Sequence, residues 1–428
     1  MAHTISRSAR LVAGAAVAAL LLGGCAAETE SELGDEPVTL RMVWWGNDVR
    51  AQATVEALAA FEEQYPNITV ETSSLPYDGY HDTLATQFAA NDAPDVFQLQ
   101  GEFMAQYASQ GALLPLTEVD LAALDPGTTE NGFRDGDQLA VAAGLSTLTV
   151  ATNPSVFEQA GIELPDDTTW TWDDYADISR DITANTPDGV FGSKSLGWDV
   201  TEVATWVSQR GNQLFTEDGE VGAEAEDFAA LFELALRMME EGGSPSASES
   251  AEQLTLAPQE SGVATSRYAM QLDAASNFPA LDSAYGGGLE MLRMPSQPGD
   301  AGDHHMMFVA SQYWGASSRT EHPAEAQLLI DFLVNSPEAG DILGVTRGVP
   351  NNTETRAAIL PDLPEADQAI PNFMSEIESE VVPSYRLTAG TSSFTGNLQR
   401  YTSEVLFGNL TPKEAAEALL EETQASVN

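Results

Sequence analysis

The sequence contains a single cysteine, Cys25, among its 428 residues. One thiol excludes an intrachain disulfide, so the folded chain depends on its apolar core for stability. The sequence also lacks a Gly-x-Ser-x-Gly segment, the strand-to-helix elbow that presents the nucleophile of many serine hydrolases. Neither a thiol mechanism nor a serine-elbow mechanism therefore has support in the sequence.

Basic residues are scarce as well. Lysine and arginine together number 17 against 66 aspartates and glutamates, which gives a formal net charge of −49. Nucleic acids and anionic lipid head groups are normally bound through basic patches, because both carry negative charge. The composition therefore excludes nucleic acid as a partner, and we interpret the acidity as a property of a well-solvated surface.

Long apolar runs are also missing, apart from one near the N-terminus. This run extends from Leu11 to Leu22, follows Arg7 and Arg10, and ends in Gly-Gly before Cys25. It is shorter than the roughly 18 apolar residues that span a bilayer. The pattern resembles a bacterial lipoprotein signal, which implies cleavage before Cys25 and attachment of lipid, such as palmitate, to its thiol. We therefore expect residues 1–24 to be a signal peptide and Cys25 to anchor the chain at the extracytoplasmic face of the cell membrane.

The next segment, residues 25–36, has no apolar period and is predicted to be a disordered tether. Beyond it the chain can bury a substantial core, since 43% of the residues are apolar and 8% are aromatic. Chains of this length usually divide into two domains.

Strand and helix patterns alternate from Val38 onward. Apolar residues recur at every second position from Val38 to Trp44, and short apolar runs at 68–71 and 96–99 predict two further strands. Between them, apolar residues at helical spacing predict helices over 55–65 and from Asp78. This βαβαβ order predicts a parallel sheet.

The second half of the chain is richer in helix signals. Thr171 to Asp174 and Thr411 to Glu414 have the spacing of capping boxes, the second with proline at the first helical position. An amphipathic helix is predicted over 228–239 and another from Pro323 to Leu333. The small, polar stretch 242–250 is predicted to be a surface loop.

Aromatic and polar residues follow the predicted strands of the first half. Ligands of open parallel sheets bind beyond the carboxyl ends of the strands, so the residues there are candidates for a binding site. They are Trp44, Trp45 and Arg50 after the first strand, Tyr77 after the second, and Gln100 and Glu102 after the third. Aromatic faces beside amide, carboxylate and guanidinium groups suit a sugar. Trp44 continues the buried period and fits the core equally well, whereas Trp45 and Tyr77 lie off that period.

Several blocks in this region resemble one family. They are Trp44-Trp45-Gly46, Phe61-Glu62, Tyr65-Pro66-Asn67-Ile68, Asp78-Gly79-Tyr80 and Ala93-Pro94-Asp95-Val96. Their order resembles that of the family 1 extracellular solute-binding proteins of sugar-importing ATP-binding cassette transporters. Later segments, including the closing helix from Thr411, are similar to further family blocks.

The resemblance implies an α/β, two-lobed, periplasmic-binding-protein-like fold with hinge crossovers and a ligand cleft between the lobes. The first lobe is expected to comprise residues 37–144 and 309–350, and the second lobe 145–308 and 351–428. One hinge is expected near Met306 to Ala310. The protein is expected to be a monomer that binds a carbohydrate and delivers it to membrane permease subunits, without a cofactor.

The resemblance also suggests positions for the site. It implies that Gln100 and Glu102 contact sugar hydroxyls, that Trp198, Trp206 and Asn212 line the second lobe, and that Trp314 and Arg347 lie in the returning segment of the first. The resemblance also implies a tryptophan that stacks on the sugar around 267–277. No tryptophan occurs there, and Tyr268 and Asn277 are the candidates to take its place. Trp206 equally fits the buried face of a helix with Val203 and Val207, and Arg347 equally fits a helix cap.

Two other classes of function remain open. A secreted glycoside hydrolase needs two carboxyl groups about 5 to 9 Å apart, and an acidic sequence offers many pairs. A receptor for a peptide or polyamine is the other alternative. No metal site is predicted, because His304-His305 lacks a matching carboxylate cluster and is expected in a solvated loop, and Asp135-Gly136-Asp137 lacks the ligand spacing of a calcium-binding loop.

Overall fold

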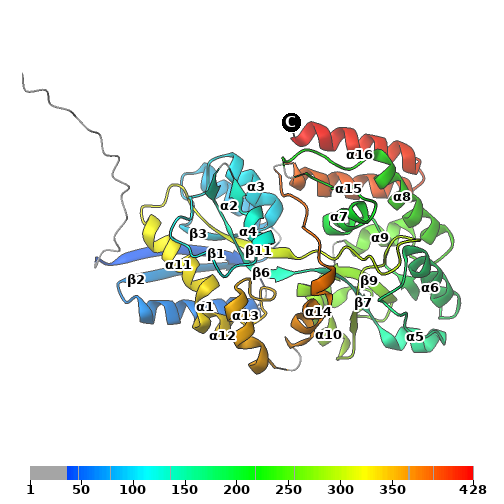
Figure 1. Cartoon of the computed structure of the whole chain (residues 1–428), viewed down its shortest axis with the longest axis horizontal. Coiled ribbons are helices and arrows are strands. Elements are labelled where there is room, and N and C mark those ends of the chain that lie inside the picture. Colours follow the sequence, from blue (N-terminus) through cyan, green and yellow to red (C-terminus); the bar gives the residue numbers. More distant parts are fainter. Residues whose placement is uncertain are drawn as a thin grey trace, which may run out of the picture. The chain divides into compact units, whose positions relative to one another are not determined.

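A computed structural model describes residues 36–427, with gaps at positions 47, 78, 135, 217, 255, 365–366 and 389. The predicted signal peptide, Cys25 and nearly all of the predicted tether lie outside the described residues. Figure 1 shows helices and strands distributed around two main sheets.

The first sheet has the strand order β2-β1-β3-β11-β6. Its strands are β1 (Val38–Trp45), β2 (Ile68–Leu75), β3 (Val96–Leu99), β6 (Val141–Ser146) and β11 (Val309–Ala316). The strand β1 pairs in parallel with β2 and β3, which confirms the predicted βαβαβ unit. The sheet as a whole is mixed, because β11 enters from a distant part of the chain and runs antiparallel to β3 and β6.

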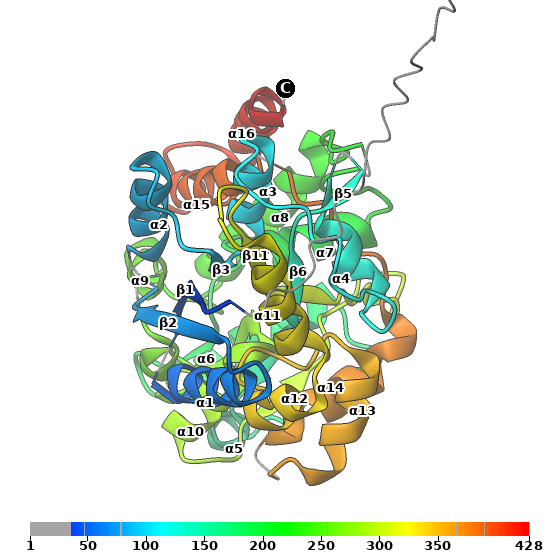
Figure 2. The same cartoon turned by 90° about the vertical axis from the view of Figure 1, so that its left-hand side faces the viewer.

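Helices cover both faces of this sheet. On one face lie α1 (Asp48–Gln64), α11 (Pro323–Asn335) and α12 (Pro337–Leu343), which contact one another beside β1 (Figure 2). They bury an apolar cluster that includes Leu40, Phe61 and Leu329. The opposite face buries Phe97, Leu84 and Met104 under α2 (Tyr80–Ala89) and α3 (Gly101–Ser109). Each face has its own core, so the sheet is held rigidly between two layers.

The second sheet has the order β10-β7-β9-β8. Its strands are β7 (Leu148–Thr152), β8 (Phe191–Ser193), β9 (Tyr268–Ala274) and β10 (Glu290–Leu292). Only Thr147 separates β6 from β7, so the chain crosses from one sheet to the other in a single residue and returns before β11. We call the two sheets with their covering helices the first and second lobes.

Most of the remaining helices belong to the second lobe, and nearly all of them contribute to one large apolar cluster. They are α5 (Pro154–Ala160), α6 (Trp172–Ala184), α7 (Val200–Gln209), α8 (Ala225–Glu240), α9 (Ala247–Gln253), α10 (Phe278–Tyr285), α14 (Ala369–Ile377), α15 (Thr391–Leu406) and α16 (Pro412–Val427). The last two pack together and against α8. The short helix α4 (Pro126–Asn131) and the hairpin of β4 (Phe133–Arg134) and β5 (Asp137–Gln138) follow the first βαβαβ unit.

Helix starts confirm two sequence predictions and correct a third. Thr171 and Asp174 form a reciprocal capping box at the start of α6, and Thr411 and Glu414 make the same pair of hydrogen bonds before α16. The stretch 242–250 was wrongly predicted to be a loop, since α9 begins within it. Its cap is the Ser246-x-x-Glu249 box, a signal hidden in a segment of small polar residues.

The segment after β11 extends farther into the first lobe than expected. The helix α13 (Thr353–Ile359) packs against α12, which packs against α1. The predicted boundary at residue 350 thus precedes a helix whose contacts are with the first lobe.

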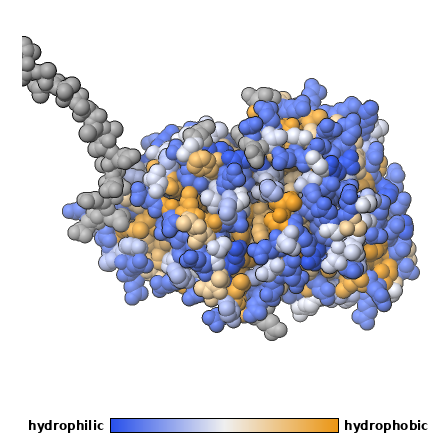
Figure 3. All heavy atoms as spheres, viewed as in Figure 1, coloured by the Kyte–Doolittle hydropathy of each residue, from blue (hydrophilic) through white to orange (hydrophobic). Residues whose placement is uncertain are grey.

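The face of the molecule seen in Figure 3 is mainly hydrophilic, with scattered apolar patches. Within the described ranges, no helix combines the length and the apolar character needed to cross a membrane.

A buried carboxylate supports the start of α7. Glu202 is only 3% exposed, and its two oxygens accept hydrogen bonds from the backbone N–H groups of Gly197 (2.6 Å) and Trp198 (3.3 Å). Burial, together with the nearby charge of Asp199, raises the pKa of Glu202 to about 7. These hydrogen bonds fix the turn that presents Asp199 to solvent.

This burial predicts a pH dependence of stability. The folded pKa lies above the ordinary glutamate value, so the folded state binds the proton more tightly and the free energy of unfolding should fall as pH rises from about 4.5 to about 7. The contribution of Glu202 is on the order of 3 kcal/mol across this range. Glu202→Gln should flatten the profile in chemical denaturation experiments. Glu233→Gln, at an exposed position on α8, is the control, and an unchanged slope in the Glu202 variant would contradict the assignment.

Candidate ligand-binding site

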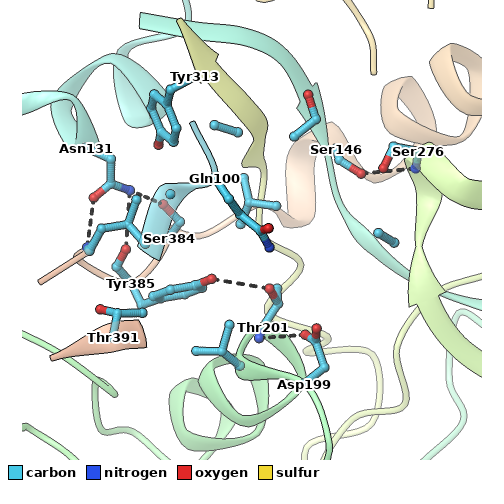
Figure 4. A pocket seen from close by; sticks show the side chains of 17 residues that line it. Gln100, Asn131, Ser146, Asp199, Thr201, Ser276, Tyr313, Ser384, Tyr385 and Thr391 are labelled. Atoms are coloured by element: carbon cyan, nitrogen blue, oxygen red, sulfur yellow. Dashed lines mark hydrogen bonds between the residues drawn. The ribbon is translucent and has the colours of Figure 1, made fainter. Parts of the chain in front are cut away.

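A pocket of about 170 Å³ lies where the two lobes meet the crossover strands. Most of the residues that line it have polar side chains (Figure 4). They come from the first lobe (Gln100, Asn131, Ser311, Tyr313), from the crossover (Ser146), from the second lobe (Asp199, Thr201, Ser276), from the segment before α15 (Ser384, Tyr385) and from the first residue of α15 (Thr391).

The topology of the first sheet explains this location. Gln100 follows the carboxyl end of β3 and is the N-cap residue of α3. Since β11 is antiparallel to β3, its first residues lie at the same edge, and Val309 pairs there with Ser146 at the end of β6. Ser146 also accepts a hydrogen bond from the backbone N–H of Ser276 (3.1 Å), which joins the two lobes beside the pocket. The polar groups predicted at this edge are therefore joined there by groups from β11, which returns from a distant part of the chain.

Asp199 supplies the carboxylate of the second-lobe wall. It caps α7 by accepting hydrogen bonds from the backbone N–H groups of Thr201 (2.7 Å) and Glu202 (3.1 Å). The side chain is open to solvent but recessed, and the surrounding protein desolvates it, which raises its pKa. The two N–H groups and Lys194 oppose this shift, whereas Asp273 adds to it. Asp199 is therefore a preoriented acceptor with spare lone pairs.

The segment before α15 closes another side of the pocket. The amide of Asn131 donates to Ser384 Oγ (3.2 Å) and to the carbonyl of Tyr385 (3.3 Å), and its oxygen accepts from the backbone N–H of Leu387. The hydroxyl of Tyr385 lies 3.4 Å from Thr201 Oγ1 across the pocket (Figure 4). One asparagine on α4 thus orders a segment that reaches the second lobe.

Tyr77, Gln100 and Trp45 form a connected group near the pocket. Tyr77 is 51% exposed and donates a hydrogen bond of 2.5 Å to Gln100 Oε1, and its ring meets Trp45 edge-on at 5.7 Å. Trp45 itself is buried against Tyr80. Glu102 lies in the first turn of α3, but its side chain is outside the described residues.

Four other candidates gather below the sheet edge rather than in the pocket. Trp44, Trp314 and Arg347 are buried, and the guanidinium of Arg347 lies 4.9 Å from the centre of the Trp314 ring. Arg50 Nε donates to the carbonyl of Thr346 (2.9 Å). The pocket lining includes none of the four. The burial of Trp44, Trp314 and Arg347 keeps these three side chains out of the pocket, contrary to the expectation that they line it.

The candidates of the second lobe are mainly structural. Trp198, Trp206 and Tyr268 are buried, and Trp206 Nε1 donates to the carbonyl of Asp227 (2.9 Å). Asn212 Nδ2 donates to the carboxylate of the same aspartate (2.8 Å). Helical spacing places Trp206 with Val203 on the buried face of α7, so the Trp206 side chain packs in the core and does not face a ligand.

Asn277 occupies a different environment from these core residues. Its amide donates to Asp273 (2.8 Å), next to the pocket residues Ala274 and Ser276.

Sequence reasoning missed the pocket residues Asn131, Asp199, Thr201 and Tyr385. The Asp-x-x-Glu pattern at 199–202 is an N-cap signal that could have located Asp199. Nothing local marks Asn131 or Tyr385, because they meet through contacts between residues about 250 positions apart in the sequence.

The histidine pair has structural partners. His304, expected in a solvated loop, is buried, and its Nδ1 lies 2.7 Å from the carbonyl of Met294. His305 Nδ1 lies 2.8 Å from Ser208 Oγ. In the described part of the chain, no group of three or more histidine, cysteine, aspartate or glutamate side chains is arranged to hold a metal ion.

Comparison with known proteins agrees with this architecture. The chain is similar to an uncharacterized ABC transporter extracellular-binding protein of Pyrococcus horikoshii, with 26% identity over 212 residues, 46% of this chain and 49% of the relative. It is also similar to an uncharacterized lipoprotein of Streptomyces antibioticus, with 26% identity over 206 residues, 45% and 42% of the two chains. The matched region therefore spans about half of the length of these curated relatives.

A solved structure extends the likeness to nearly the whole chain. It is a periplasmic oligogalacturonide-binding protein of Yersinia enterocolitica in complex with saturated digalacturonic acid, with a TM-score of 0.77 and 22% identity over 90% of this chain and 100% of that one. This similarity establishes the two-lobed fold. A family model, "Bacterial extracellular solute-binding protein", matches residues 46–340, more than half of the chain. The chain thus belongs to the bacterial extracellular solute-binding proteins.

Proposed function

We propose that the protein is an extracytoplasmic receptor that binds a carbohydrate in this pocket and delivers it to an ATP-binding cassette importer. The observation that carries the proposal is the composition of the pocket lining, which combines hydroxyl, amide and phenol groups with the single described carboxylate Asp199. Sugars present closely spaced hydroxyls that donate and accept hydrogen bonds, and this lining offers both roles. The sugar-binding relative of similar fold supports the same class of ligand.

Delivery requires that the receptor signal its occupancy. Pocket groups come from both lobes, so a bound sugar makes its full set of contacts only when the lobes enclose it. Such a ligand favours the enclosed state, because only differential affinity shifts a conformational equilibrium. The crossovers at Thr147 and near 306–310 are the proposed hinges.

Attachment to the membrane is the remaining part of the proposal. The apolar run ending at Cys25 supports lipidation there, and one relative is named as a lipoprotein. A tether of about ten residues would let the receptor reach a permease in the same membrane.

Two alternatives are discriminated by experiment. A glycoside hydrolase needs a carboxyl pair, and the described pocket lining offers only Asp199. A cationic solute would suit that carboxylate. Product analysis after incubation with oligosaccharides tests the first alternative, and a thermal-shift panel of sugars, peptides and polyamines tests the second.

Asp199→Asn is the sharpest test of the pocket. Asparagine caps a helix about as well as aspartate, so α7 should remain intact while the charged acceptor is lost. Sugar affinity should fall by about 10- to 100-fold in calorimetry, the range for a hydrogen bond to a charged group. Asp173→Asn, which removes an exposed carboxylate on α6, is the matched control. Full affinity in the Asp199 variant would remove this pocket as the binding site.

Lobe closure is tested by small-angle scattering. Saturating amounts of a sugar identified in the panel should reduce the radius of gyration, because the bound state brings the two walls of the pocket together. Asp199→Asn at the same sugar concentration should give a smaller change. A scattering profile unaffected by saturating ligand would favour a rigid binding module.

Cys25→Ser tests the anchor. The variant should retain its leader or appear in the soluble fraction, because serine provides no thiol for lipid attachment. Cell fractionation and intact-mass measurement report both outcomes, with Ser31→Ala in the adjacent tether as the control. Membrane retention with an unchanged mature mass would contradict lipidation at this residue.

A further inference from the structure

We propose that Arg347, Arg50 and Trp44 form a site for a small anion on the α1 side of the first sheet. The two terminal guanidinium nitrogens of Arg347 and the indole nitrogen of Trp44 are buried and have no hydrogen-bond partner. Arg347 is 3% exposed and Trp44 is 1% exposed. Leaving such donors unsatisfied is costly, so each requires an acceptor.

Strand register brings these donors to one place. Val43 pairs with Phe97, so the next residues, Trp44 and Gln98, stand side by side on β1 and β3. Gln98 pairs in turn with Trp314 on β11. The guanidinium of Arg347 lies over the Trp314 ring, and its Nε faces Gln98 Oε1 at 3.4 Å. The row Trp44, Gln98 and Trp314 therefore forms the floor on which Arg347 lies.

Arg347 is a buried cation that lies near a second cation, Arg50. Arg50, in the first turn of α1, is close enough to repel Arg347, and the N-terminal end of a helix adds further positive potential. Burial and this repulsion lower the pKa of Arg347, while Tyr80 opposes the shift. Arg347 takes part in none of the ion pairs formed between described residues. An enclosed cation of this kind needs a counter-charge.

The chemistry of the free atoms identifies the class of ligand. All three unpartnered atoms are hydrogen-bond donors, and an anion offers only acceptor positions to them. A water molecule in the same place would also need acceptors for its own two hydrogens. The neighbouring Tyr80 hydroxyl is already directed at the carbonyl of Gln98 (2.8 Å). Three donors suit a small acceptor such as a halide or a single carboxylate group, which a free anion or an acidic sugar could supply.

The site is connected to the crossover between the lobes. The carbonyl of Arg347 accepts from Gln312 Nε2 (2.9 Å) and from Ser311 Oγ, and Ser311 lines the pocket. Two residues later, Val349 exchanges backbone hydrogen bonds of 2.6 and 2.9 Å with Leu145 near the end of β6. An anion that fixes Arg347 would therefore stabilise the segment that supports the hinge.

The test uses the full chain in gluconate buffer at constant ionic strength, titrated with chloride or bromide. The melting temperature should rise saturably with the halide, because ligands that bind the folded state stabilise it. The rise should disappear in Arg347→Gln and shrink in Trp44→Phe, which keeps the ring but loses the N–H group. Arg319→Gln, at an exposed arginine of the same lobe, should respond like the unmodified protein.

Bromide-soaked crystals provide a measurement that does not depend on variants that fold poorly. An anomalous peak in contact with the Arg347 guanidinium and Trp44 Nε1 would support the site. Galacturonate and galactose distinguish the sources, since an Arg347-dependent preference for the acid would assign the site to a ligand carboxylate. Ordered water at these atoms, together with a flat halide titration and no preference for galacturonate, would overturn the proposal.

Discussion

The geometry of the pocket depends on backbone pairing at the point where the chain leaves the first sheet. Leu145 and Val349 exchange two hydrogen bonds, and Val309 pairs with Ser146, so three distant segments meet within two residues of the crossover at Thr147. Gly144 permits the close approach, because a Cβ atom there would lie 2.3 Å from the carbonyl oxygen of Arg347. The pocket walls on both sides are positioned from this junction.

Two chemically different environments lie on either side of that junction. The pocket is rich in hydroxyl groups and carries the negatively charged Asp199, whereas the cluster around Arg347 is donor-rich and cationic. In a chain with a net charge of −49, a buried arginine with a second arginine close by is costly to the stability of the fold. The charge separation is consistent with a polyol in the pocket and an anion beneath it.

Much of the scaffold could be predicted from local patterns. The period-two alternation of β1 and the Thr171 and Thr411 capping boxes specify their elements with groups only a few residues apart. Local patterns were misread at α9, where the small, polar composition led to the prediction of a loop although Ser246 and Glu249 form a capping box. Local patterns also left Trp44 and Trp206 undecided between core and binding site, because aromatic residues serve equally well as core and as stacking platforms.

The sequence by itself determined the family and the βαβαβ unit, and it is the basis of the proposal that the ligand carries hydroxyl groups. The tertiary structure decided which polar groups face the pocket. Asn131, Asp199 and Tyr385 belong to separate segments and become neighbours only when the return strand β11 and the segment before α15 are in place. The tertiary structure also decided the burial of Trp44 and Arg347, because α1 and the loop at 346–349 cover the sheet there. Long-range packing of this kind leaves no periodic signal in the sequence.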